Sequence, residues 1–534
     1  MKRIQCVLAI FAALLVASLA GCDFGMVRVA PKAVAPPPVA IGAVAPALPE
    51  QPGGDPGPSK SDCTMFGGSP SRNMVNLIDK KVPTDWSVEE KKERNVKWVA
   101  ELGKKTYGGP VISGGKIFVG TNNVNPRDPN LKGDFAILMA FNEADGKFLW
   151  QIAHEYPADD DTFKDALKEG LCSTPIVEGK HLYYVTPTAR VICADVNGKV
   201  VWTYDMLKEL KVSPFHLANC SPLIVDDLVM LSTSNGVNDE GKVVSPKAPS
   251  FIAVNKKTGK LVWQSSLPGK EIIEGTWSNP TLAIVNGQKQ VLFAGGDCVI
   301  YSFDAATGNL VWKCDCLPIR KKGGREIDNY IISTPVVVGE RMYVGLGVYP
   351  ENAQATRHSH FVCLDITKKG DVSPKSYDAK DPKNKGSALV WAFGGPIDPP
   401  PPKGRQVYFG RTISTAAVHD GLVYIAEETG YIHCLDANTG FRCWDHDFKA
   451  SVWGSPYYVD GKVYIGTEDG DIFIFAPSKE RAYWKDGKLT LANKAGDKVL
   501  PATNMDEVIH STPVVANGVL YITTRSKLYA IGGK

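Results

Sequence analysis

The sequence has no marked excess of charge of either sign. It contains 60 Lys and Arg residues against 57 Asp and Glu residues, a formal net charge of +3. Removal of Lys2 and Arg3 with an amino-terminal leader would lower that charge to +1. A chain so close to neutrality gives no support for nucleic-acid binding, which depends on clustered positive charge.

A strong catalytic pattern is also missing. No two cysteines are adjacent, and no Ser/His/Asp set or phosphate-binding Gly loop stands out. His358 and His360 have the spacing of a two-imidazole metal clip, but no third ligand follows nearby, and exposed His residues at a strand entry are the commoner case. The sequence therefore predicts neither catalytic residues nor a metal site.

Long hydrophobic runs are absent except for Ile4 to Ala20, which follows Lys2 and Arg3 as in an export signal. Residues 19–22, Leu-Ala-Gly-Cys, are similar to the bacterial lipobox, in which the Cys is acylated. We therefore predict a lipoprotein signal peptide at 1–21 and lipidation of Cys22. A plain signal peptide or an amino-terminal membrane anchor is the alternative. Lipidation would anchor the protein in the cell envelope, on the periplasmic face or the outer membrane.

Two segments separate the leader from the repeats. Residues 22–60 are rich in Ala and Pro and poor in charge, so they cannot form a core and are predicted to be a lipidated tether. Residues 61–94 have mixed polarity and are expected to wrap the rim of the folded domain.

One unit recurs eight times: a small polar residue, Pro, an apolar strand, a tight turn and a second apolar strand. Its first residues read Ser-Thr-Pro at 173–175, 333–335 and 511–513, with variants at 109–110, 220–222, 278–280, 414–416 and 454–456. No such unit can bury its apolar face alone, so the units must stack on one another.

The second half of the unit predicts two more strands. The third strand ends in Asp or Asn, a Thr-Gly type turn follows, and the fourth strand contains a Trp, as in residues 303–312. Four antiparallel strands make one propeller blade, and the indole N–H can reach a neighbouring turn. We interpret these tryptophans as structural.

The two ends of the repeat region predict how the ring closes. The last copy stops after its third strand at 528–531, and a Trp strand without a preceding unit occurs at 95–100. Pairing the two removes open sheet edges. The fold expected for 95–534 is an all-β, eight-bladed β-propeller of four-stranded antiparallel blades, closed by the strand of Trp98.

The 12 cysteines suggest disulfides in an exported protein. Cys193, Cys363 and Cys434, however, occupy a slot of the third strand that elsewhere holds Ala or Ser, so they are interpreted as packing residues. The sequence leaves open whether disulfides join Cys314 to Cys316 and Cys434 to Cys443.

The long loops fall mainly on one face of the predicted ring, between second and third strands and between blades. We assign the working surface to this first face, because binding concentrates on long loops of rigid scaffolds. Residues just ahead of the innermost strands should meet at its centre and could hold a planar anionic ligand; alternatively they plug the channel. The candidates are Tyr107, His216, Asn219, Trp277, Asn329, Tyr330, Arg411, Trp453 and His510.

The unit at 304–312 resembles the pyrroloquinoline quinone (PQQ) repeat. Two groups of proteins contain it: quinoprotein dehydrogenases, which use PQQ and calcium, and non-enzymatic PQQ-like propellers, including the outer-membrane assembly lipoprotein. With segments such as 65–68 and 453–456, the chain is also similar to PQQ-like repeat proteins of planctomycete-type bacteria.

The resemblance implies two competing functions. We expect a membrane-tethered, non-enzymatic scaffold without a cofactor, which binds envelope proteins such as β-barrel assembly components in outer-membrane protein assembly. The alternative is a PQQ-dependent alcohol or sugar dehydrogenase, which would stack PQQ between a Trp and adjacent cysteines and bind calcium beside a catalytic Asp. A third possibility is a soluble sensor with a small molecule in the funnel.

Overall fold

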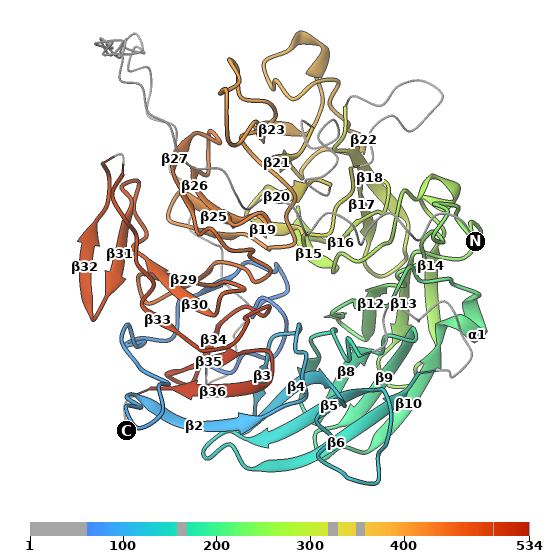
Figure 1. Ribbon diagram of the computed structural model, residues 1–534. Coiled ribbons are helices and arrows are strands. Elements are labelled where there is room, and N and C mark those ends of the chain that lie inside the picture. Colours follow the sequence, from blue (N-terminus) through green and yellow to red (C-terminus); the bar gives the residue numbers. More distant parts are fainter. Residues whose placement is uncertain (1–60, 157–167, 319–328, 349–357, 495, 533–534) are drawn as a thin grey trace, which may run out of the picture. The chain divides into compact units, whose positions relative to one another are not determined.

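The computed structural model describes residues 61–156, 168–318, 329–348, 358–494 and 496–532. These residues form eight sheets, one short helix, α1 (Met206–Leu210), and two 3-10 helices, η2 (Gly269–Glu271) and η3 (Pro382–Asn384) (Figure 1). The predicted signal peptide, tether and lipidated Cys22 lie outside the described residues.

Seven sheets are blades of the predicted kind, built on four antiparallel strands. One of them gains a fifth strand, β22 (Gly370–Asp371), which runs parallel to β18. The first strand of each blade is innermost, and the blades consist of β3 (Val111–Ser113), β4 (Lys116–Asn122), β5 (Phe135–Asn142) and β6 (Phe148–Glu155); β7 (Ile176–Glu178), β8 (His181–Val185), β9 (Arg190–Asp195) and β10 (Val200–Asp205); β11 (Leu223–Val225), β12 (Leu228–Ser232), β13 (Phe251–Asn255) and β14 (Leu261–Ser265); β15 (Thr281–Val285), β16 (Gln288–Ala294), β17 (Val299–Asp304) and β18 (Leu310–Asp315); β19 (Val336–Val338), β20 (Arg341–Leu346), β21 (His360–Asp365) and β23 (Leu389–Gly394); β24 (Ala417–His419), β25 (Leu422–Ala426), β26 (Tyr431–Asp436) and β27 (Arg442–Asp447); and β34 (Val514–Ala516), β35 (Val519–Thr523), β36 (Lys527–Ile531) and β2 (Val96–Glu101).

The remaining sheet has seven strands and a different order. After β30 the chain contains Pro477 in place of the Asp and Thr-Gly turn, so the next strand meets β30 at a single residue pair, Phe475 with Tyr483. The prediction of eight four-stranded blades is therefore wrong, since only seven have that form. The mixed sheet contains β1 (Val75–Asn76), β28 (Tyr457–Val459), β29 (Lys462–Gly466), β30 (Asp471–Phe475), β31 (Ala482–Lys485), β32 (Lys488–Leu491) and β33 (Thr503–Asn504).

The ring closes as the sequence predicts. Strand β2 pairs antiparallel with β36 (Figure 1). In this pairing Trp98 lies opposite Ala530. Apolar clusters fill the spaces between neighbouring sheets all round the ring. The core is therefore a series of interfaces between sheets, each of which hides its apolar face on the next.

The blade tryptophans dock each blade on its neighbour. Trp202 Nε1, for example, donates to the carbonyl of Lys256 in the next blade at 3.1 Å, and Gly259 lies against the indole. Gly259 has φ +67°, and a Cβ there would approach Trp202 to 2.7 Å, so glycine suits both the turn and the contact. The interpretation of these tryptophans as structural is confirmed.

Residues 61–76 do not wrap the rim, which corrects part of the expectation for 61–94. They cross the centre of the ring. There their backbone forms hydrogen bonds with the innermost strands, which in an ordinary propeller face an open channel. These hydrogen bonds join Cys63 O to Ile112 N (2.9 Å), Thr64 O to Val177 N (2.8 Å), Pro70 O to Leu282 N (2.9 Å), Ser71 O to Val337 N (3.0 Å) and Met74 O to Tyr458 N (2.9 Å).

Arg72 anchors this central segment. Its side chain is fully buried, and burial lowers its pKa to about 10. The guanidinium donates to four carbonyl oxygens, those of Phe66 (2.9 Å), Pro280 (2.9 Å), Ser221 (3.1 Å) and Pro222 (2.8 Å). Carbonyl dipoles from the segment itself and from two blades thus stabilise the buried charge.

Candidate ligand-binding cavity

A cavity of about 500 Å³ lies at the centre of the ring. Its floor comes from the central segment, including Met65, Phe66 and Met74. Its walls come from residues just ahead of the innermost strands, on the face of the long loops. The central segment therefore closes the predicted funnel at its floor.

Seven of the predicted funnel residues line this cavity. Asn329 and Tyr330 do not; both are buried, and Tyr330 packs with Val348 beside the wall. The lining residues among the candidates are Tyr107, His216, Asn219, Trp277, Arg411, Trp453 and His510.

An aromatic cluster forms one wall. The Tyr107 and His510 rings stack with centroids 4.8 Å apart, and Trp453 lies 5.7 Å from Tyr107 and 5.1 Å from His510. His510 also bonds Glu468 at 2.9 Å. Burial lowers the pKa of His510 although Glu468 opposes the shift. The His510 imidazole in this wall is therefore uncharged at neutral pH.

A second aromatic group contributes Trp277, which stacks on Phe215 with centroids 5.8 Å apart. Asn219 lines the cavity as well, and its buried Oδ1 has no hydrogen-bond partner in the structure. Flat apolar faces with a few polar atoms suit a planar ligand held by stacking and hydrogen bonds.

The cationic group expected to attract an anion is already paired. Arg411 is largely buried and forms an ion pair with Glu428. Glu169, also in the wall, pairs with Lys105 at 2.6 Å. The cavity therefore offers compensated charges, and the prediction of an anionic ligand loses its main argument.

Two thiols line the cavity, Cys63 and Cys172. Burial raises the pKa of each to about 12, so both are protonated at neutral pH and poor nucleophiles. Within the described ranges, no three His, Cys, Asp or Glu side chains gather to hold a metal ion. His360 is not exposed as expected, because its side chain is buried against Tyr377, with ring centroids 3.4 Å apart.

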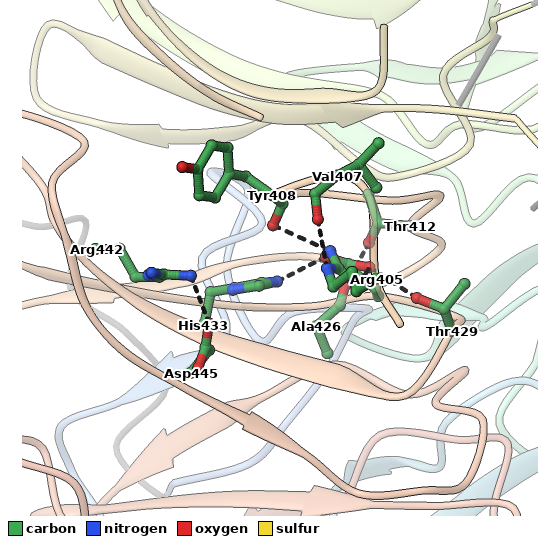
Figure 2. A network of polar contacts seen from close by, with 10 residues as sticks. Arg405, Val407, Tyr408, Thr412, Ala426, Thr429, His433, Arg442 and Asp445 are labelled. Carbon is green, nitrogen blue, oxygen red and sulfur yellow. Dashed lines mark hydrogen bonds and ion pairs between the residues drawn. The ribbon is translucent and has the colours of Figure 1, made fainter. Parts of the chain in front are cut away.

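A buried polar network holds the long loop that leads to Arg411. Arg405, Thr429 and His433, which are labelled in Figure 2, all form hydrogen bonds with the Glu427 carboxylate. Arg405 Nη1 lies 2.9 Å from Oε2, Thr429 Oγ1 2.7 Å from Oε2, and His433 Nε2 2.6 Å from Oε1.

Burial by itself would raise the pKa of Glu427, but the hydrogen bond from His433 and the charge of Arg405 lower it to about 2. Arg405 also donates to the carbonyls of Val407 at 2.6 Å and Tyr408 at 3.0 Å. The network thereby fixes the connection between β23 and β24, whose end enters the cavity wall.

Sequence reasoning missed the floor and this network. The Gly pair at 67–68, with φ values of +75° and +70°, was the available signal for a tight turn in the central segment. No sequence motif marks Glu427 as a network residue. Its partner Arg405 reaches it from the preceding loop, and His433 reaches it from the neighbouring strand β26.

The family model described as "Outer membrane protein assembly factor BamB" matches residues 86–372 and 382–531. A protein with the same description from Xanthomonas campestris pv. campestris is 35% identical over 79 residues, which cover 13% of this chain and 20% of that protein. The dehydrogenase subunit of "Alcohol dehydrogenase (quinone)" from Komagataeibacter europaeus is 25% identical over 167 residues, 31% of this chain and 20% of that subunit. These alignments span about a fifth of the length of each curated relative.

Among solved structures, BamB from Moraxella catarrhalis is similar with a TM-score of 0.48 and 15% identity, over 82% of this chain and 96% of that one. The quinohemoprotein alcohol dehydrogenase ADHIIG from Pseudomonas putida HK5 has a TM-score of 0.42 and 13% identity, over 89% and 81%. Because the family model matches most of the sequence, from the closing strand to the last, this chain belongs to the BamB-type family of PQQ-like repeat propellers.

Proposed function

We propose that this chain is a membrane-tethered, non-enzymatic binding propeller of the cell envelope that serves outer-membrane protein assembly. The observation that carries the proposal is the match of the BamB-type family model to residues 86–372 and 382–531. The paired charges and protonated thiols of the cavity agree with a binding role, since they supply no activated nucleophile.

The point where the central segment begins supports an orientation. Ser61 Oγ accepts a hydrogen bond from Asn517 N at 2.8 Å, and Asp62 accepts one from Gly114 N at 3.0 Å. Both donors lie in short turns, so residue 61 lies on the face opposite the long loops. A tether that continues from there would leave the long-loop face free to meet partners. Within the described part of the chain, no helix is long and apolar enough to span a membrane.

Site-specific photo-crosslinking in the native host tests this proposal. A photoreactive residue at Val124 or Val244, which are 47% and 51% exposed in long loops, should capture β-barrel assembly components. The same residue at Phe441, 73% exposed in a short turn of the opposite face, is the matched control. Capture from Phe441 alone, or of no assembly component from any position, would contradict the proposal.

A quinoprotein dehydrogenase is the second candidate, favoured by the aromatic cavity and by the partial similarity to the quinone alcohol dehydrogenase subunit. The residues present do not fit its cofactor: no adjacent cysteines exist in the sequence, and the described residues offer no carboxylate cluster for calcium. Purified protein supplied with PQQ and calcium should then show neither a shift in quinone absorbance nor dye-linked alcohol oxidation. Oxidation that Trp277→Ala abolishes would establish the enzyme instead.

A further inference from the structure

The pairing of β26 with β27 contains a β-bulge that places two cysteines together. Cys434 lies opposite Trp444, and the next pair is Leu435 with Arg442, so Cys443 is the extra residue of the bulged strand. In such a bulge two residues of one strand oppose a single residue of the other. Cys443 therefore shares the position opposite Cys434.

The two thiols are within hydrogen-bonding reach of each other. Both pack against the same apolar cluster between neighbouring sheets. Cys434 is buried, with Sγ 3.7 Å from the carbonyl of Ser478, whereas Cys443 is partly exposed. A reagent can thus reach Cys443 first, because Cys434 is shielded from solvent.

The other blades contain the same bulge but never two cysteines there. In each, a register shift occurs beside the Trp, and the extra residue lies across from the small slot of the third strand. Cys193 and Cys363 occupy that slot too, each opposite a tyrosine as Cys434 is opposite Tyr424. The slot and bulge residues elsewhere are Ala140 and Leu149, Cys193 and Val201, Ala253 and Val262, Ser302 and Val311, Cys363 and Val390, and Ala530 and Lys97.

Lys479 lies beside the pair. It forms an ion pair with Asp436 at 2.9 Å and interacts electrostatically with both thiols. Burial raises the pKa of both thiols, and the charge of Lys479 partly offsets that effect by favouring the thiolate, which is the form that reacts with disulfides. The site therefore combines two adjacent thiols, one point of access and a positive charge.

We propose that Cys434 and Cys443 form a reversible disulfide that ties β26 to β27 across the bulge. The Cys443 thiolate attacks a disulfide oxidant, either a small-molecule disulfide or a protein disulfide, and releases one thiolate. The Cys434 thiolate then attacks the Cys443 sulfur of the mixed disulfide and releases the second. Two protein thiols are oxidised and one disulfide is reduced, so atoms and electrons balance. The oxidising compartment that would maintain the bond rests on the proposed envelope location.

Peptide mapping of the purified full-length protein tests the bond directly. The protein is equilibrated with oxidised glutathione, its free thiols are alkylated, and it is digested with trypsin without reduction. Cleavage after Arg442 separates the cysteines into peptides 412–442 and 443–449, each with one cysteine. We expect these peptides as one linked species that dithiothreitol separates. Recovery of both as alkylated peptides, or of Cys443 joined only to glutathione, would overturn the proposal.

Matched variants control for chance oxidation. In Cys443→Val, which installs the residue found at four of the equivalent bulges described above, the linked species should disappear while the fold is kept. Val390→Cys should create a new link between peptides 358–368 and 386–403 through Cys363, because it copies the same geometry. Cys193 should stay alkylated throughout, and its oxidation to the same extent would refute a site-specific pair. None of these results depends on partner capture, so the disulfide can fail while the proposed function stands.

Discussion

The buried Glu427 network yields a pH-dependent stability that can be measured. The pKa of Glu427 is about 2 in the folded protein against 4.5 for an ordinary glutamate. A lowered folded-state pKa stabilises the fold above pH 4.5, and that contribution is lost as the pH falls toward 2. With about 1.4 kcal/mol for each pKa unit, the proton-linked contribution is about 3.5 kcal/mol at pH 7 and about 1.5 kcal/mol at pH 3.

Urea unfolding of the wild type and of Glu427→Gln tests this reasoning. The difference in unfolding free energy between the two should shrink by about 2 kcal/mol from pH 7 to pH 3, because only the wild type has a carboxylate whose ionisation stabilises the fold. Arg405→Met should be destabilising, since it leaves the buried carboxylate without its cation. The double variant should be less destabilised than the sum of the single variants. A gap that stays constant with pH, together with additive effects, would refute the reasoning.

Three further predictions concern the frame of the ring and its anchor. Arg72→Met should lower the unfolding free energy by about 4 kcal/mol, because four buried carbonyls lose their donor. A urea midpoint equal to that of the wild type would show that Arg72 does not anchor the central segment. Trp98→Ala should cost about 3 kcal/mol and speed proteolysis at the closing blade, as judged by limited digestion. Cys22→Ala should abolish labelling by radioactive palmitate and release the protein from the membrane fraction, and persistent labelling would show that the lipobox assignment is wrong.

The blade architecture was predictable because its determinants are local. Each turn, each Trp and each small residue opposite it occur within one unit of the sequence, and the unpaired Trp strand at the start matches the missing strand at the end. Most funnel residues were also found, since a residue just ahead of an innermost strand must lie near the axis. The sheet that contains β28 departs from the four-stranded form where Pro477 replaces the usual turn.

The sequence alone determined the repeat, the closing strand, the structural tryptophans and the approximate ring of candidate residues, because short-range spacing specifies strands and turns. Only the tertiary structure decided that Arg72 and its neighbours fill the centre, that Arg411 is paired with Glu428, and that Cys434 meets Cys443. These features join residues brought together by sheet packing or by a bulge, and no periodic pattern in the chain encodes such contacts. Burial and hydrogen bonding then set the charge of individual groups. Burial raises the pKa of the cavity thiols, Cys63 and Cys172, whereas hydrogen bonds keep Glu427 ionised.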